Sequence, residues 1–250
     1  ETVAHFLSFD RRYPNSVVSC VSFARENART VREVISREMW QQLNELYLMV
    51  KDASKSPGPI EEMADYFERV KLAGIHYAGV TDATLSHGEA WHFCRLGRLL
   101  ERADKTSRIL DVKYFVLQPS QQQGGPTIDQ VGWTALLNSA SALQMYRQTE
   151  HIITPRRVAR FLLLSDEFPR SIRHCVKRAQ RSLHALTGTP VGNYKTEAER
   201  LLGKLVADLD YADIDQVVDY GLHEYLDELQ TTLNAVSSSV HKQFFEHAEK

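Results

Sequence analysis

The chain has 250 residues, of which 43% are hydrophobic and 25% are charged, and its 30 Lys and Arg residues face 32 Asp and Glu residues for a net charge of −2. This composition is typical of a globular protein that can bury a sizeable core without disulfides or a structural metal. The chain has no basic excess, so nucleic acid is not an expected partner. It also has no run of about 18 apolar residues, so we expect neither a transmembrane helix nor a membrane partner.

The cysteines and the missing motifs narrow the class of protein further. Cys20, Cys94 and Cys175 are odd in number and far apart, which is typical of reduced thiols and predicts a cytoplasmic protein. The sequence lacks the dinucleotide-binding, P-loop, nucleophile-elbow and Cys-x-x-Cys motifs. It contains only 12 Gly and eight Pro, whereas a doubly wound α/β enzyme uses more of both in its turns.

Apolar residues recur at steps of three and four along nearly the whole chain, which predicts an all-α helical bundle of six to eight helices, several of them long, with no sheet. We expect one domain over residues 1–250, with the polar loop at 118–127 as a possible division between halves. The first helix is expected to begin at an Asn15 or Ser16 cap. The expected helices span 15–52, 60–80, 86–117, 128–151, 155–164, 167–187, 196–209 and 214–246.

The helix expected over 86–117 carries the clearest chemical pattern. Its packed seam is formed by Leu96, Leu99, Ala103, Thr106 and Leu110. A charged stripe with Glu101, Asp104 and Arg108 follows another face, and Arg98 and Arg102 flank the seam. The stripe is either a solvated face with weak ion pairs or a polar site between helices. In such a site, the carboxylates would bind a cation or an amine, and the arginines would bind a carboxylate or a phosphate.

Two further segments carry candidate binding residues. Arg25 and Arg29 lie one helical turn apart, with Glu26 between them, so they form either an arginine clamp for an anion or a solvated face. Arg170 precedes Ser171, which is a candidate helix cap. The Arg170 side chain is expected to point into a cleft if this segment belongs to the site.

Metal binding and nucleophilic catalysis receive little support. Glu89 and His92 have the Glu-x-x-His spacing of ferritin-like di-iron bundles, but such bundles need two copies and two more glutamates. No second copy is present, so no metal is expected. His87, Glu89 and His92 remain candidates for a polar pocket. Cys94 and Cys175 lie in amphipathic segments and are interpreted as small core residues.

The segment HGEAWHFCRLGRLLERADKTSRILDVKY at 87–114 is similar to the characteristic segment of the bacterial alpha-E domain family. That family is named for an α-helical domain with a Glu-Arg motif, which is Glu101–Arg102 here. Residues 24–47, 133–147 and 161–175 resemble the family as well. Family members usually begin with a further helix of the same kind, so we expect that an N-terminal helix is missing from this chain, which starts with Glu1.

The resemblance implies an association with circularly permuted ATP-grasp proteins and transglutaminase-like proteins, and therefore with ATP-dependent ligation or modification of peptides. ATP and Mg would be used by the ATP-grasp partner, and this chain would bind no cofactor itself. The substrate would be a peptide or an amino acid. Family knowledge supplies no catalytic assignment for the helical domain.

Two functional hypotheses follow, and both stay open at this point. In the first, the chain is an enzyme or enzyme subunit with Glu101, Arg102 and Asp104 as candidate catalytic residues. The candidate substrate-binding residues are Arg25, Glu26, Arg29, Arg98, Arg108, His87, Glu89 and Arg170. In the second, the chain is a non-catalytic scaffold that docks an ATP-grasp or transglutaminase-like partner. Convergence of Glu101, Arg102 and Arg25 in one pocket would favour the first hypothesis.

Overall fold

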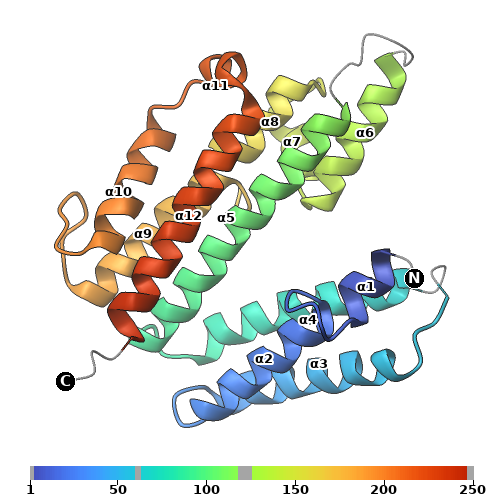
Figure 1. The fold of residues 1–250 in the computed structure, drawn as a ribbon, viewed down its shortest axis with the longest axis vertical. Helices are drawn as coiled ribbons and strands as arrows, with labels where there is room; N and C mark the ends of the chain where they lie inside the picture. Colours follow the sequence, from blue (N-terminus) through green and yellow to red (C-terminus); the bar gives the residue numbers. More distant parts are fainter. Residues whose placement is uncertain (1–2, 60–62, 118–125, 247–250) are drawn as a thin grey trace. The chain divides into compact units, whose positions relative to one another are not determined.

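The computed structural model describes residues 3–59, 63–117 and 126–246, and within these ranges the side chains of all residues except 113–117 and 126–129. The described part of the chain contains twelve α-helices and no strand (Figure 1). The all-α class is therefore confirmed, but the expected number of six to eight helices is wrong. No helix in this part is both long enough and apolar enough to cross a membrane.

The chain divides into two compact units, Glu1–Trp91 and His92–Lys250. The division falls in the first turn of the helix α5 (Glu89–Leu117). Most of the loop at 118–127, where the sequence suggested a possible division, lies outside the described residues. The expectation of one domain over 1–250 stays a prediction.

The first unit contains four helices, α1 (Val3–Phe9), α2 (Val17–Thr30), α3 (Arg37–Lys55) and α4 (Met63–Thr84). Its apolar contacts form two clusters. One cluster is centred on Val18, Val21, Val50, Met63 and Tyr66. The other is centred on Met39, Leu85 and Trp91. Because α3 contributes to both clusters and contacts both α2 and α4, it connects the helices of this unit.

The single helix expected over 15–52 is in fact two helices. Ser16 caps α2, as one of the two expected caps, but α2 ends at Thr30. A turn follows, and the hydroxyl of Ser36 accepts from the backbone N–H of Met39 to start α3. Ile35 keeps the apolar spacing across the turn because it packs against the cluster around Met39. The apolar periodicity of the sequence therefore continues across the turn between α2 and α3 and does not reveal that the helix ends there.

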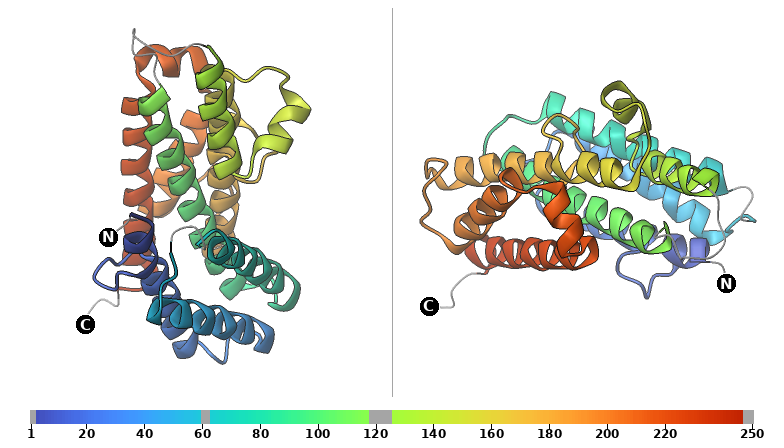
Figure 2. Two further views of the ribbon diagram at one scale, coloured as in Figure 1. Left: turned by 90° about the vertical axis from the view of Figure 1, so that its right-hand side faces the viewer. Right: turned by 90° about the horizontal axis from the view of Figure 1, so that it is seen from above.

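The second unit contains α5 and seven further helices, and its large core is formed mainly by Leu, Val and Ala side chains. In this unit α12 runs beside α5 and contacts α10, which in turn contacts α9 (Figures 1 and 2). The seven helices are α6 (Pro126–Ser139), α7 (Leu143–Thr149), α8 (Pro155–Leu164), α9 (Ile172–Thr187), α10 (Glu197–Asp210), α11 (Ile214–Tyr220) and α12 (Leu222–Phe244).

Two long helices expected in this unit are also broken, each at a residue with a positive φ angle. Ser141, with φ of 52°, separates α6 from α7 where one helix was expected over 128–151. Gly221, with φ of 119°, separates α11 from α12 where one helix was expected over 214–246. Glycine adopts this left-handed region without the steric cost that a Cβ atom brings. The expected helix over 167–187 begins later, at Ile172, because Ser171 caps it.

A buried carboxylate organises the connection between α9 and α10. The Glu199 side chain is fully buried, and its oxygens accept from the backbone N–H groups of Lys195 (2.6 Å) and Thr196 (2.9 Å) and from the hydroxyl of Thr187. With Thr196 it forms a capping box at the start of α10. Burial alone would raise the pKa of Glu199, but these hydrogen bonds lower it to about 2.

We predict that Glu199→Gln lowers the free energy of unfolding by roughly 2 kcal/mol at pH 7, because hydrogen bonds to an ionised group are lost. The folded-state pKa lies below the unfolded value of 4.5. The stabilisation is therefore fully present above pH 4.5 and disappears as the pH falls toward 2. Urea unfolding between pH 3 and 7 measures this difference.

The matched control is Glu197→Gln, which removes an exposed carboxylate in the first turn of the same helix. It should leave the unfolding midpoint nearly unchanged. A Glu199→Gln protein that is as stable as the wild type at pH 7 would contradict the structural role of Glu199.

Candidate functional site

The two residues of the Glu101–Arg102 motif face different neighbours in the second unit. Successive residues of an α-helix project about 100° apart, so the two side chains leave α5 in different directions. Arg102 Nη1 donates to the carbonyl oxygen of Pro169 at 3.2 Å. Glu101 instead lines a cavity between α5 and α12. The two residues of the motif therefore contact different neighbours and do not pair with each other.

Arg102 belongs to a set of contacts that hold the loop between α8 and α9. The carbonyl oxygen of Pro169 also lies 3.4 Å from Cys175 Sγ, which donates to it. One turn further along α5, Thr106 Oγ1 donates to the carbonyl oxygen of Arg170 at 2.9 Å. Ser171 then caps α9 by accepting from the backbone N–H of His174. Two segments that the sequence analysis singled out separately therefore meet at this loop.

Arg102 and Arg170 place two positive charges near each other where α5 meets this loop. In the described part of the chain, no carboxylate oxygen lies within 4.0 Å of the guanidinium nitrogens of Arg98, Arg102 or Arg170. Burial and the nearby Arg102 guanidinium lower the pKa of Arg170. Burial raises the pKa of Cys175 to about 11 despite both guanidinium groups. Cys175 is therefore a protonated core thiol at neutral pH, as expected, and not a thiolate nucleophile.

Glu101 lies at the edge of an apolar cavity of about 420 Å³. Its side chain is 66% exposed and pairs with Lys105, four residues further along α5, at 3.0 Å. The ring of His241 stacks on Phe245 at the same cavity. The full lining is Phe93, Leu96, Gly97, Leu100, Glu101, Ser237, Val240, His241 and Phe245.

Asp104 and Arg108 form a second ion pair along the charged stripe. Arg108 Nε donates to Asp104 Oδ2 at 2.8 Å, and Lys105 Nζ lies 3.3 Å from the same oxygen. Partial burial disfavours the Asp104 carboxylate, but these cations lower its pKa. Further along, Asp111 accepts from His223 of α12 at 2.8 Å. The stripe therefore combines ion pairs within α5 with one contact to α12.

Arg25, Glu26 and Arg29 belong to the first unit, and Glu101 and Arg102 belong to the second. These two groups of candidate residues therefore lie in different units. Arg25 Nε donates to Asn44 Oδ1 at 2.7 Å, and its Nη1 donates to Glu26 at 3.1 Å.

The Arg25 guanidinium also lies 4.7 Å from the ring centre of Tyr47 and 5.6 Å from that of Trp40. Arg29 donates to Glu26 at 2.8 Å, and both of these side chains are exposed. Cation–π contacts of this kind contribute about 0.5–1 kcal/mol each at exposed sites. Arg25 is therefore engaged in contacts that join α2 to α3.

The candidates near the start of α5 do not form a ligand cage. The ring of His87 stacks on Trp91 at 4.2 Å and contacts the carbonyl oxygen of Asp82. Trp91 Nε1 donates to the Asp82 carboxylate at 3.2 Å. Glu89 is exposed in the first turn of α5. Within residues 3–59, 63–117 and 126–246, no group of three His, Cys, Asp or Glu side chains is arranged to hold a metal.

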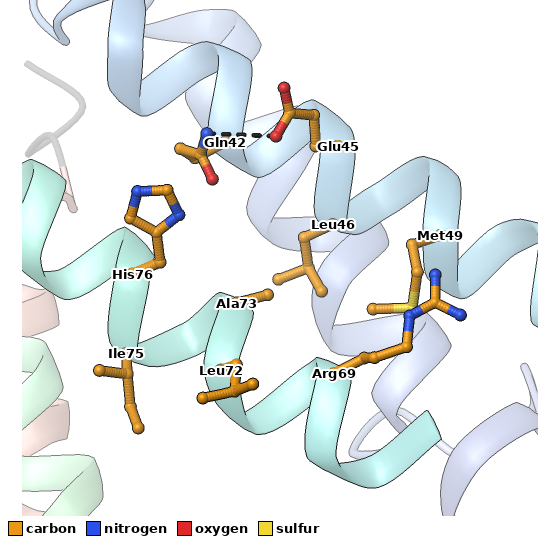
Figure 3. Close-up of a pocket in the computed structure, with 9 residues that line it drawn as sticks. All are labelled: Gln42, Glu45, Leu46, Met49, Arg69, Leu72, Ala73, Ile75 and His76. Atoms are coloured by element: carbon orange, nitrogen blue, oxygen red, sulfur yellow. Dashed lines mark hydrogen bonds between the residues drawn. The ribbon is translucent and has the colours of Figure 1, made fainter. Parts of the chain in front are cut away.

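The first unit contains a cavity of about 580 Å³ between α3 and α4 (Figure 3). Its apolar side chains come from both helices, and Gln42 donates to Glu45 at one edge. None of the sequence-predicted site residues lines this cavity. The lining consists of Gln42, Glu45, Leu46, Met49, Arg69, Leu72, Ala73, Ile75 and His76.

A charged cluster between α7 and α8 contains none of the site residues predicted from the sequence. Glu150 is 11% exposed and pairs with Arg157 at 3.1 Å and with Arg160. Two cavities, of about 500 and 410 Å³, are both lined by Glu150 and Arg160. These residues lie on both sides of the Thr154–Pro155 helix start, so no single helical period connects them. Only the density of charge at 150–160 could have indicated the cluster.

The fold and the motif together define an all-α protein in which one long helix carries a Glu-Arg pair. The chain belongs to the Alpha-E family, which is described as a predicted alpha-helical domain with a conserved ER motif and whose model matches residues 1–245. The resemblance seen in the sequence is therefore confirmed.

Two curated relatives are similar to most of the chain. They are the uncharacterized protein Mb2597 of Mycobacterium bovis and the uncharacterized protein MT2643 of Mycobacterium tuberculosis. Each is 23% identical over 237 residues, which cover 92% of this chain. The match spans only 26% of each relative's own length. No solved structure matches the chain significantly.

We predict that Thr106→Val destabilises the protein by about 1–2 kcal/mol, because the Arg170 carbonyl loses its donor from α5. Urea unfolding measures the change. Thr232→Val is the control. The Thr232 hydroxyl donates to a carbonyl oxygen of its own helix, so its removal breaks no hydrogen bond between two helices. Equal unfolding midpoints for the two variants would refute the contact between α5 and the α8–α9 loop.

Proposed function

We propose that this chain is a non-catalytic helical component of an ATP-grasp-linked peptide or amide ligation system. In this role it would dock a circularly permuted ATP-grasp protein or a transglutaminase-like protein and hold a peptide or amino-acid substrate near it. ATP and Mg would be used by the ATP-grasp partner. The proposal extends the family assignment to a partner class and a role.

The observation that carries the non-catalytic role is the use of the Glu-Arg motif in contacts within the protein. Arg102 donates to the Pro169 carbonyl, and Glu101 and Asp104 each pair with cations of α5. An acid–base group needs access to the substrate proton that it moves and a pKa near the working pH. The lowered pKa of Asp104 does not meet the second requirement, and the Glu101 carboxylate is already paired with Lys105.

The length of the relatives supports a role as a module of a larger assembly. The region similar to this chain makes up about a quarter of each mycobacterial relative. A helical domain joined to much longer sequence is suited to docking or positioning functions that other domains complete.

One observation favours a second candidate, in which the chain contributes an acid–base group itself. Glu101 and His241 line the same cavity between α5 and α12. A carboxylate and an imidazole on one cavity are a pair that enzymes use for proton transfer. This second candidate predicts loss of chemistry when Glu101 is replaced and the fold is retained.

The proposal predicts that this chain co-purifies with an ATP-grasp or transglutaminase-like protein encoded near it, and that ATP-dependent amide formation by the mixture requires the chain. Glu101→Gln should leave the turnover number of the assembled system within about twofold, because the carboxylate takes no part in proton transfer. The measurement combines affinity co-purification with an assay of ADP release and amide product.

Glu45→Gln is the matched control, since it removes an exposed carboxylate of the first unit. A folded and partner-bound Glu101→Gln protein without ligation activity would support the catalytic candidate and reject the scaffold. Failure of every such partner to bind, with unchanged activity in the absence of this chain, would reject both.

A further inference from the structure

Arg98 and Arg102 of α5 and Arg170 of the α8–α9 loop carry charge that no carboxylate in the described part of the chain neutralises. Arg98 and Arg102 lie one turn apart on α5. Arg170 is the residue after Pro169, and Arg102 donates to the carbonyl oxygen of Pro169. None of the three has a carboxylate within 4.0 Å in the described part of the chain. All three are partly buried. This set of three residues is called the arginine triplet below.

Arg173, another partly buried arginine of the second unit, is paired with carboxylates. Arg173 pairs with Asp210 at 2.9 Å and with Asp166 at 3.1 Å. A charge that is moved out of water without a partner lowers stability unless something else neutralises it. The triplet therefore differs from Arg173, whose charge two carboxylates neutralise.

The triplet retains donors for an external acceptor. A guanidinium group carries five N–H donors in a planar fork, and Arg102 uses Nη1 for the Pro169 carbonyl. The Nε atom of Arg98 is buried without a hydrogen-bond partner. The side chain of Arg170 makes no hydrogen bond within residues 3–59, 63–117 and 126–246. Arg102 and Thr106 fix the backbone of residues 169 and 170 against α5, so this backbone is held in place before any ligand arrives.

We propose that Arg98, Arg102 and Arg170 form a binding site for an oxyanion, either a phosphate group or a carboxylate. Guanidinium forks match the oxygen spacing of both groups and bind them with charge-assisted hydrogen bonds. A phosphate carries about 1.5 to 2 negative charges at neutral pH and therefore neutralises more of the triplet than a carboxylate does. The site is separate from the Glu101 cavity and does not depend on the partner proposed above.

The test is isothermal titration of the purified chain with sodium phosphate in one arm and sodium acetate in the other, at matched ionic strength. We expect saturable binding of at least one anion. Arg170→Gln should weaken that binding about tenfold or more, which corresponds to the loss of about 1.4 kcal/mol. Binding of phosphate but not acetate assigns the site to phosphate groups, and the reverse result assigns it to carboxylates.

Arg181→Gln is the control, because Arg181 is an exposed arginine of α9 and its replacement changes the net charge equally. It should bind the anion like the wild type. The Arg170 side chain makes no hydrogen bond or ion pair within the described residues, so we expect Arg170→Gln to melt at or above the wild-type temperature.

The proposal would be overturned by no saturable binding of either anion at millimolar concentration. Equal weakening by Arg170→Gln and Arg181→Gln would also overturn it, since that result indicates only a general effect of charge. A clear fall in melting temperature of Arg170→Gln without added anion would assign Arg170 to the fold, and would count against the site as well.

Discussion

The second unit depends on the attachment of the α8–α9 loop to α5. Two carbonyl oxygens of this loop, at Pro169 and Arg170, accept hydrogen bonds from side-chain donors. Arg102 and Thr106 supply them from one face of α5. These two contacts hold the residues that directly precede the start of α9. Ser171 caps α9 directly after the attached residues, and the core then packs around α9.

This attachment gives the Glu-Arg motif a physical meaning. An arginine is suited to this contact because its long side chain reaches a carbonyl oxygen of another element. Its planar, always charged guanidinium group has several N–H donors, so further donors remain available. The glutamate next to it faces α12 and an open cavity. The two residues therefore need not cooperate in one reaction. Two adjacent residues of a helix can thus have different roles, one making a structural contact and the other presenting an exposed side chain.

Local patterns predicted the parts of the fold that depend on local physics. The caps at Ser16 and Ser171 are predicted by residue type at the helix starts, and the structure contains both. The breaks at Ser141 and Gly221 were missed because apolar spacing continues across them. Cys94 was interpreted as a core residue and is exposed.

Contacts between distant segments could not be read from periodicity at all. Arg102 and Pro169 are 67 residues apart, and nothing local to either one indicates the other. Arg25 illustrates the opposite case, since its spacing suggested an anion clamp while Asn44, Trp40 and Tyr47 of the next helix engage it. The sequence identified which residues carry charge, but only packing decides which of those charges remain available.

The most direct test of the central claim is hydrogen–deuterium exchange over residues 165–175, compared between the wild type and Arg102→Gln, with Glu101→Gln as the neighbouring control. The amides of Ser171, His174 and Cys175 donate within this segment, so their protection reports on the attachment. The account predicts faster exchange at these amides in Arg102→Gln and unchanged exchange in Glu101→Gln. Equal protection in all three proteins would contradict it.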